Sequence, residues 1–456
     1  MVSEINEYRH TMYYSLLITN YLNFLLPALL VACTVYERIY GSLAAHEYIY
    51  DALWFHLLWG VVIVYASYRC VRSGIWRRPL TALLHLSLVT IALGISLTTF
   101  TSRRGTLHFR QGVPTSNFFT ETHRVVTLPE TLTLEGVYTA HTHAYYLLRS
   151  DCDSLYTLAS NSVVQIGDYR IYLTSADADL QGVNVKIIND RNGRNLSRLG
   201  FYLFLVILLL KLAQLPFRAY RWAKRRAFLW TDLRCRTRIF SIALFACSTL
   251  YFLFEWAHQG FVPLITITDT LLVVSILLSL LSLIIAKNAR LQNIVHLFGW
   301  ALLIITLMTN DYSTVAPRTL PQALNSRWLS IHVSTIILAY SMLTICSLHS
   351  FISIKHKRNA PSSPRSRSSQ AFLRYSVYLL TAGIIFGALW AGDAWGDYWS
   401  WDAKEVWALI TLLLYTIPLH KATSDDLYHR YIIIAFLALL MTYFGGTYLL
   451  GGMHGY

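Results

Sequence analysis

The sequence predicts a polytopic α-helical membrane protein with about 11 transmembrane helices and one small β-rich extracytoplasmic domain. Three observations predict this fold class. Hydrophobic residues make up 55% of the 456 residues and charged residues only 14%, whereas about 25% of residues are charged in soluble domains. Apolar runs recur along the chain, and each is about 20 residues long, enough to cross a bilayer. One long segment, residues 101–198, instead has short alternating runs between Gly, Asn, Asp and Pro turns, a pattern typical of strands.

The first three spans are expected at Met12–Cys33, Ala52–Cys70 and Leu80–Phe100. The loop between the second and third spans, R-C-V-R-S-G-I-W-R-R, contains four arginines. Loops rich in Lys and Arg stay on the cytoplasmic side of a membrane. We therefore expect a cytoplasmic N-terminus, with no cleavable signal peptide, and a third span that leads to the outer face.

The β-rich domain is expected to follow the third span. The fourth span, Leu199–Leu215, then returns to the cytoplasmic side, where residues 216–238 form the most basic stretch of the chain. This linker is expected to divide a first module, residues 1–215, from a second module, residues 239–456. The expected strands include the runs Thr106–Arg110, Arg124–Leu128, Ser162–Ile166, Tyr169–Leu173 and Val183–Ile188.

The second module is expected to contain seven more spans. Basic residues are common in two of its expected inside loops and sparse in the outside loops, which places the C-terminus outside. The same distribution explains the net charge of +14 by topology and not by nucleic-acid binding. The six cysteines are scattered without a C-x-x-C pair, so a disulfide framework, a zinc site and a thiol relay are all unsupported. The seven spans are Ile239–Ala257, Leu264–Ala286, Ile294–Thr309, Leu329–Ile352, Phe372–Ala391, Val406–His420 and Tyr431–Leu450.

The segment Trp395–Glu405, W-G-D-Y-W-S-W-D-A-K-E, is the strongest functional signal. Five of the 13 tryptophans lie between Trp390 and Trp407. A belt of interfacial aromatic residues explains one or two of them, but not five with interleaved aspartates. A flat aromatic surface at the membrane would suit a large planar ligand such as a porphyrin, and an aromatic belt with incidental polar residues remains the alternative.

The acidic residues of this segment have two explanations. Asp393, Asp397, Asp402 and Glu405 are candidates for acid–base chemistry or cation transport. Acidic residues also favour the first turn of a helix, and an N-cap role for Asp402 at the span beginning with Val406 is a sufficient explanation for at least one of them.

Four histidines are candidate metal ligands. The topology places His332 and His454 on the outer face with the tryptophan-rich segment, and imidazole is a common axial ligand of haem iron. His85 and His420 lie toward the inner side of their spans, where a histidine usually faces the bundle interior or a site. A structural or interfacial role remains the alternative for both. His56 and His296 are expected to be structural, and His349 and His429 unremarkable.

The tryptophan-rich segment resembles the signature of the haem-handling WWD family of cytochrome c assembly proteins. The segment P-Q-A-L-N-S-R-W-L-S-I-H-V, ending next to His332, and the terminal G-G-M-H-G-Y, with His454, resemble the family's two external histidine segments. Y-T-I-P-L-H resembles the segment of a membrane histidine, His420. In the first half, C-T-V-Y-E-R-I-Y-G-S, I-Y-D-A-L-W-F, L-L-H-L-S-L and R-G-T-L-H-F-R-Q-G resemble the partner subunit, with His85 as its membrane histidine. The whole chain thus resembles the fused CcsB–CcsA (ResB-like plus CcsA) family of system II biogenesis.

This resemblance implies a haem exporter and cytochrome c synthase of the bacterial cytoplasmic (inner) membrane. Haem b would enter at His85 and His420, and His332 and His454 would hold its iron at the outer site. The thiols of a C-x-x-C-H segment in apocytochrome c would then add to the haem vinyl groups. Thiol or disulfide reductants are further expected partners, and nucleic acid is not. The resemblance also assigns haem-binding or catalytic roles to Trp390, Trp395, Gly396, Tyr398, Trp399, Trp401 and Asp402.

Three features depart from the family or test the assignment. Ala403 stands where the family usually has proline, and the β-rich domain is short compared with many family partners. His85 lies about six residues inside its span whereas His420 ends its own, a depth difference of roughly 8 Å. Alternative functions are a haem carrier that forms no covalent bond and an electron-transfer subunit with two bis-His haems.

Overall fold

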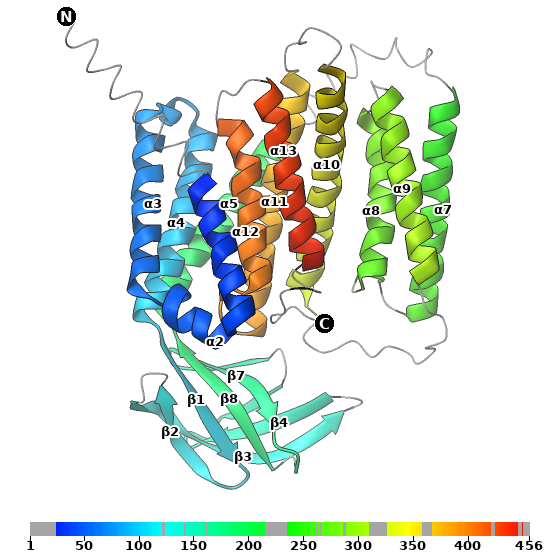
Figure 1. Cartoon of the computed structure of the whole chain (residues 1–456). Helices are drawn as coiled ribbons and strands as arrows, with labels where there is room; N and C mark the ends of the chain where they lie inside the picture. The colour runs from blue at the N-terminus through cyan, green and yellow to red at the C-terminus, as the bar shows by residue number, and fades with distance from the viewer. Residues whose placement is uncertain are drawn as a thin grey trace, which may run out of the picture.

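The protein consists of a helical bundle with a β-sheet domain at one end (Figure 1). The computed structural model describes residues 24–120, 124–140, 143–159, 162–179, 181–214, 235–260, 262–264, 266–285, 289–309, 326–357, 367–420, 425–445 and 449.

In the first half of the chain, helices precede and follow the sheet domain in the sequence. A helix runs through residues 24–40. Next come α2 (Ser42–Ala45), the π-helical turn η1 (His46–Tyr50), α3 (Leu53–Arg72), the 3₁₀ turn η2 (Ile75–Arg77) and α4 (Pro79–Thr101), and α5 (Arg191–Ala213) follows the sheet. α5 begins eight residues before the predicted span at Leu199, because the polar turn Arg191–Arg198 is helical without being apolar.

The second half is mostly helical over its described residues, and its longest described loop is residues 395–402. It comprises α7 (Cys235–Gln259), α8 (Ile267–Ile285), α9 (Ala289–Thr309), α10 (Arg327–Lys357), α11 (Arg367–Ala394), α12 (Ala403–His420), α13 (Asp425–Leu440) and η5 (Met441–Gly445).

These helices confirm the predicted fold class, a multi-pass helical membrane protein with one small antiparallel sheet. Eight of the described helices are long and apolar enough to cross a membrane, and the apolar part of α8, Ile267–Leu283, is shorter. α12 coincides with the predicted span Val406–His420. The helix through residues 24–40 overlaps the predicted span Met12–Cys33 over residues 24–33, and the earlier part of that span lies outside the described residues. α12 is less apolar, since Lys404 and Glu405 lie in its first turn and His420 ends it.

The sheet has eight strands in the order β5-β4-β3-β2-β1-β8-β7-β6. Every named pair of strands is antiparallel. The sheet buries its own apolar cluster, which includes Phe109, Phe118 and Ile171. The strands are β1 (Arg103–Arg110), β2 (Pro114–Thr120), β3 (Val125–Ala140), β4 (His143–Ser150), β5 (Leu155–Leu158), β6 (Val163–Ile166), β7 (Tyr169–Ala176) and β8 (Gly182–Asn189).

Two helices connect this sheet to the bundle. β1 follows α4 directly and β8 leads into α5, and the two strands pair from Arg103 with Asn189 to Arg110 with Gly182. α4 and α5 then pack closely, because a Cβ on Gly94 would lie only 2.8 Å from Ser197 Cα. We call the end of the bundle where α4 ends and α5 begins the sheet end, and the opposite end the far end.

The two halves of the chain share their apolar cores. One cluster combines Phe201 and Phe204 of α5 with Ile385 and Leu389 of α11. A larger cluster combines Tyr50 and Phe55 with residues of α10 to α13. The predicted boundary at residues 216–238 lies mostly outside the described residues, so the division into two modules stays a prediction.

Candidate functional site

The tryptophan-rich segment connects α11 to α12 at the sheet end. Gly396 has φ +91°, and a Cβ there would lie 2.9 Å from Tyr172 Cε2 and closer still to Ile188. Glycine thus fits both the backbone and the space. Trp401 adopts φ +58° with a side chain in place, which costs about 1–2 kcal/mol for an L-residue. Its neighbours must offset this strain.

Trp401 lies in a cluster of aromatic rings from both halves of the chain. Its ring stacks on Tyr50 with centroids 5.7 Å apart and planes 5° from parallel. Phe55 meets it edge-on at 4.9 Å, Trp59 lies 5.6 Å away and Trp399 5.8 Å away. The Nε1 groups of Trp59 and Trp399 are buried without a hydrogen-bond partner within the described part of the chain.

The tryptophans do not form the flat surface predicted from the sequence. Trp399 and Trp401 are perpendicular, with an interplanar angle of 87°. Trp390 and Trp395 are inclined at 63°, and Trp390 is only 2% exposed. Aromatic rings prefer such edge-to-face packing because of their quadrupoles. The rings therefore make a packed cluster, and a role for Trp390 in ligand binding stays a prediction.

The acidic residues of the segment have structural partners. The Lys404 amide donates to Asp402 Oδ1 at 2.9 Å, so Asp402 is the N-cap of α12. The Ser400 amide donates to Glu405 at 2.8 Å. Tyr398 accepts a hydrogen bond from Arg198 of α5, and burial raises the pKa of its hydroxyl.

His332 lies at the sheet end of α10. It is close to the start of α10 and contacts the later part of α11, since a Cβ on Gly387 would lie 2.8 Å from its ring. Its Nδ1 bonds the Gly383 carbonyl at 2.7 Å. His454, the second predicted external ligand, lies outside the described residues.

His85 and His420 come together at the far end of the bundle. Their ring centroids are 5.9 Å apart and their planes are at 85°. The rings thus meet despite the depth difference expected from their positions in sequence. Since a metal–imidazole bond is about 2 Å long, two rings sharing one metal have centres about 6 Å apart.

The three described candidate ligands share one feature of hydrogen bonding. Nδ1 of His85 bonds the Thr81 carbonyl at 2.8 Å, and Nδ1 of His420 bonds the Thr416 carbonyl at 2.9 Å. His332 does the same with Gly383. A carbonyl only accepts, so each Nδ1 carries the proton and Nε2 keeps its lone pair. This arrangement is typical of metal-binding histidines.

Lys211 is a neighbour of this pair that the sequence analysis missed. Its ammonium donates to Thr81 Oγ1 at 3.2 Å and lies 5.4 Å from the Tyr378 ring centroid. A lysine near the end of an apolar helix looks like an ordinary end of a span, so the sequence held no separate signal.

Other histidines also have partners. His349 and His429 have ring centroids 5.9 Å apart, and His429 Nδ1 lies 3.0 Å from Ser350 Oγ. The sequence singled out neither as functional. His296 is buried and bonds Ser241 and Ser282, in keeping with the structural role expected for it.

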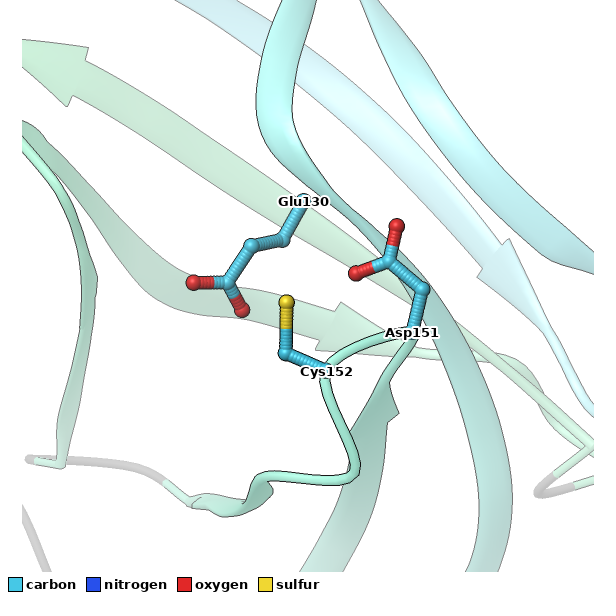
Figure 2. A group of neighbouring side chains, drawn as sticks. All are labelled: Glu130, Asp151 and Cys152. Carbon is cyan, nitrogen blue, oxygen red and sulfur yellow. The ribbon is translucent and has the colours of Figure 1, made fainter.

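One group of side chains within the described ranges is arranged so that it could hold a metal ion. The ligand atoms of Glu130 on β3 and of Asp151 and Cys152 in the turn between β4 and β5 lie within 4.8 Å of one another (Figure 2). Glu130 already accepts from Ser150 at 2.5 Å and from Tyr156 at 3.3 Å. Two of the three residues are exposed, and hydrogen bonding to Asp151 raises the pKa of the Cys152 thiol. Hydrogen bonds within and around this turn therefore explain why the three side chains lie close together.

The fold and the site define a class of protein. It is a multi-pass membrane protein with a histidine pair at one end and, at the other, an aromatic cluster with a further histidine.

Comparison with known proteins narrows this class. Residues 264–454 match the family model described as cytochrome C assembly protein. A cytochrome c biogenesis protein CcsA from Guillardia theta is 30% identical over 259 residues, which cover 47% of this chain and 83% of that protein. The protein of the same name from Chlamydomonas reinhardtii is 32% identical over 227 residues, which cover 45% of this chain and 64% of that protein. The chain belongs to the cytochrome c assembly (CcsA) family, which supports a role in cytochrome c biogenesis.

Proposed function

We propose that this protein exports haem b across the bacterial cytoplasmic membrane and attaches it covalently to C-x-x-C-H segments of apocytochrome c. Haem is the cargo and the substrate. It binds first at His85 and His420, and then at the tryptophan-rich segment with His332 and His454. The first half of the chain then corresponds to the CcsB (ResB-like) partner of system II, with the sheet end on the extracytoplasmic (periplasmic) side of the membrane.

The observation that best supports this proposal is the contact between the rings of His85 and His420. They come from α4 and α12, in different halves of the chain, and their ring centroids are 5.9 Å apart. Each Nε2 keeps its lone pair because the helix's own carbonyl binds Nδ1. Two such nitrogens from opposite sides are the donor set of a bis-His haem. Lys211 supplies a positive charge next to His85 for a carboxylate of the porphyrin.

The outer site fits the same ligand. His332 lies near the start of α10, at the end of the bundle where Trp395, Trp399 and Trp401 also lie. The buried indole N–H groups of Trp59 and Trp399 lack partners within the described chain. Aromatic rings and an imidazole together suit a porphyrin. His454 completes the iron ligands in this proposal.

The attachment reaction needs positioning more than acid–base catalysis. Each cysteine thiol adds across one haem vinyl group: a carbon–sulfur bond forms, and the thiol proton ends on the neighbouring carbon. The addition is redox-neutral, so reductants serve only to keep the thiols and the iron reduced beforehand. The histidine of C-x-x-C-H replaces one axial ligand, and the protein holds the reactants in place.

The test expresses this chain with an apocytochrome carrying C-x-x-C-H in cells that lack their own assembly system. We expect covalent haem staining of the cytochrome. His85→Ala, His420→Ala or His332→Ala lowers staining at least about 10-fold, and added imidazole partly restores it for His332→Ala. His258→Ala, at the end of α7, is the matched control and leaves staining unchanged.

Absence of covalent haem with a well-expressed chain would overturn the synthase proposal. If haem still co-purified with the membrane protein, the carrier function would replace it. A purified protein with no haem spectrum would count against both functions, and against an electron-transfer subunit as well.

A further inference from the structure

We propose that the β-sheet domain positions the tryptophan-rich segment, with Arg170, Lys186 and Arg104 as positioning residues that bind its backbone and its Asp397. This proposal rests on the proposed function only for the reaction that the segment performs. The contacts between the sheet and the segment are part of the fold and do not depend on that reaction. They give a role to a domain that the sequence left without one.

Arg170 of β7 binds the backbone of the segment from the side of the sheet. Its guanidinium donates to the Gly396 carbonyl at 3.0 Å and lies 3.4 Å from the Gly392 carbonyl. Tyr172, two residues along the same strand, donates to the Gly392 carbonyl at 3.1 Å. The sheet therefore binds the last turn of α11 at Gly392 and the tryptophan-rich segment four residues later at Gly396.

A buried ion pair fixes Arg170 itself. Its guanidinium donates to Asp190 at 2.8 Å, and the two side chains are 5% and 4% exposed. Asp190 lies at the junction of β8 and α5. Breaking a buried pair by removing one partner is strongly destabilising, because it leaves an uncompensated charge. Arg170 thus has one orientation, set by the sheet, when it meets the segment.

Asp397 is the second point of attachment. Its carboxylate is 8% exposed and lies 2.7 Å from Lys186 Nζ on β8 and 3.0 Å from Arg104 Nη2 on β1. Burial raises the pKa of this carboxyl, but the two cations more than offset that effect and hold the pKa below its usual range. Asp397 therefore stays charged at neutral pH.

The packing leaves little freedom between these two points. Gly396 lies against Tyr172 and Ile188 with no room for a Cβ. The segment thus follows the surface of β7 and β8 from Gly392 to Asp397. Trp399 and Trp401 follow within four residues, so a shift at Asp397 would move the aromatic cluster.

The test measures hydrogen exchange of residues 391–402 in the purified full-length chain. The double variant Lys186→Met with Arg104→Met removes both ion-pair partners of the buried Asp397 carboxylate. We expect exchange of the segment to rise at least about 10-fold, because hydrogen bonds to charged groups are the stronger ones that oppose local opening. Exchange of β3 and β4 should not change, which shows that the sheet is folded.

Two matched variants complete the experiment. Lys186→Arg keeps the charge and should retain wild-type exchange of the segment. Arg149→Met removes an arginine of the same sheet whose ion pairs with Glu135 and Asp153 are exposed, and it should leave the segment unchanged. A double variant with wild-type exchange in residues 391–402 would overturn the proposal, and so would loss of protection with Arg149→Met.

This measurement is independent of the proposed synthase activity. If the segment loses protection but wild-type protein forms no covalent cytochrome, the positioning role holds and the proposed function fails. If covalent attachment proceeds normally in the double variant and exchange is unchanged, the proposed function holds and the positioning role fails.

Discussion

At the scale of single residues, the tryptophan-rich segment depends on side chains that shape its backbone. Asp402 caps α12 through the Lys404 amide, and Trp401 just before it holds φ +58°. Tyr50 stacks on Trp401 from η1, where His46 bonds Asp51 at 3.1 Å. A local cap therefore shapes the backbone next to Trp401, and a ring from the first half of the chain packs on its side chain.

Substitution of Asp402 separates its capping role from a catalytic role of its charge. An asparagine also caps a helix, whereas replacing the cap by alanine costs about 0.5–2 kcal/mol. We expect Asp402→Ala to lower the thermal midpoint of the purified protein and Asp402→Asn to retain both the midpoint and most covalent haem attachment. Loss of attachment in Asp402→Asn at unchanged stability would show that the charge itself is required.

The His46–Asp51 pair predicts a pH dependence of stability. The hydrogen bond that His46 donates to the Asp51 carboxylate raises the pKa of His46 above its usual value. A raised pKa means that the stabilisation is fully present below about pH 6.5 and is lost as pH rises through the folded-state pKa. We expect a falling thermal midpoint from pH 6 toward alkaline pH in wild type, and a smaller slope in both His46→Gln and Asp51→Asn. Equal slopes in all three proteins would contradict this assignment.

At the scale of elements, the pair α4–α5 connects the sheet to the bundle and carries His85. The two helices approach closely at Gly94 and Gly193, where a Cβ would meet Ser197 or Thr98. Small residues permit such approach in membranes, where packing drives helix association. The position of His85 relative to α12 thus depends on a glycine contact.

Two glycines of the first half offer a matched test of this contact. A Cβ on Gly94 would lie 2.8 Å from Ser197 Cα, whereas one on Gly60 of α3 would meet nothing within 4 Å. We expect Gly94→Ala to cost about 1–3 kcal/mol through overpacking and Gly60→Ala to be neutral or slightly stabilising. Thermal unfolding in one detergent measures both, and equal midpoints would show that α4 and α5 can separate without loss.

The sequence predicted elements better than their contacts. Apolar length located the spans, and the predicted span Leu80–Phe100 matches α4 (Pro79–Thr101) within one residue at each end. Alternation found five of the eight strands but not β2, β4 or β5, whose runs alternate less clearly. No local pattern could show that Arg170 binds Gly396, because this contact joins residues from different halves of the chain.

The contrast between local sequence patterns and tertiary contacts applies to the candidate site as well. A polar residue inside an apolar run marked His85, and an aromatic cluster marked the tryptophan-rich segment. The orientation of the rings depends on tertiary packing, so the expected flat surface became a perpendicular cluster around Trp401. The contact between the rings of His85 and His420 likewise depends on tertiary packing, which spacing along the sequence does not give.

At the scale of the whole molecule, the two halves behave as one structure. The tryptophan-rich segment of the second half lies between Tyr50, Phe55 and Trp59 of the first half and the sheet domain. The apolar cluster of α5 and α11 joins them again inside the bundle. The surfaces that join the halves therefore include both proposed haem sites.

This arrangement predicts that the two halves stay associated when the covalent link between them is removed. Expressed as two polypeptides, residues 1–215 and 216–456, the halves should co-purify, because each alone exposes the apolar surfaces that they share. Phe55 is fully buried and its ring centroid lies 4.9 Å from that of Trp401. Since truncating a buried aromatic costs about 3–5 kcal/mol, Phe55→Ala should sharply reduce co-purification. Leu57→Ala, on an exposed position of the same helix, is the control and should not. Halves that purify separately in wild type would show that the covalent linker, and not the shared core, holds the two haem sites in one protein.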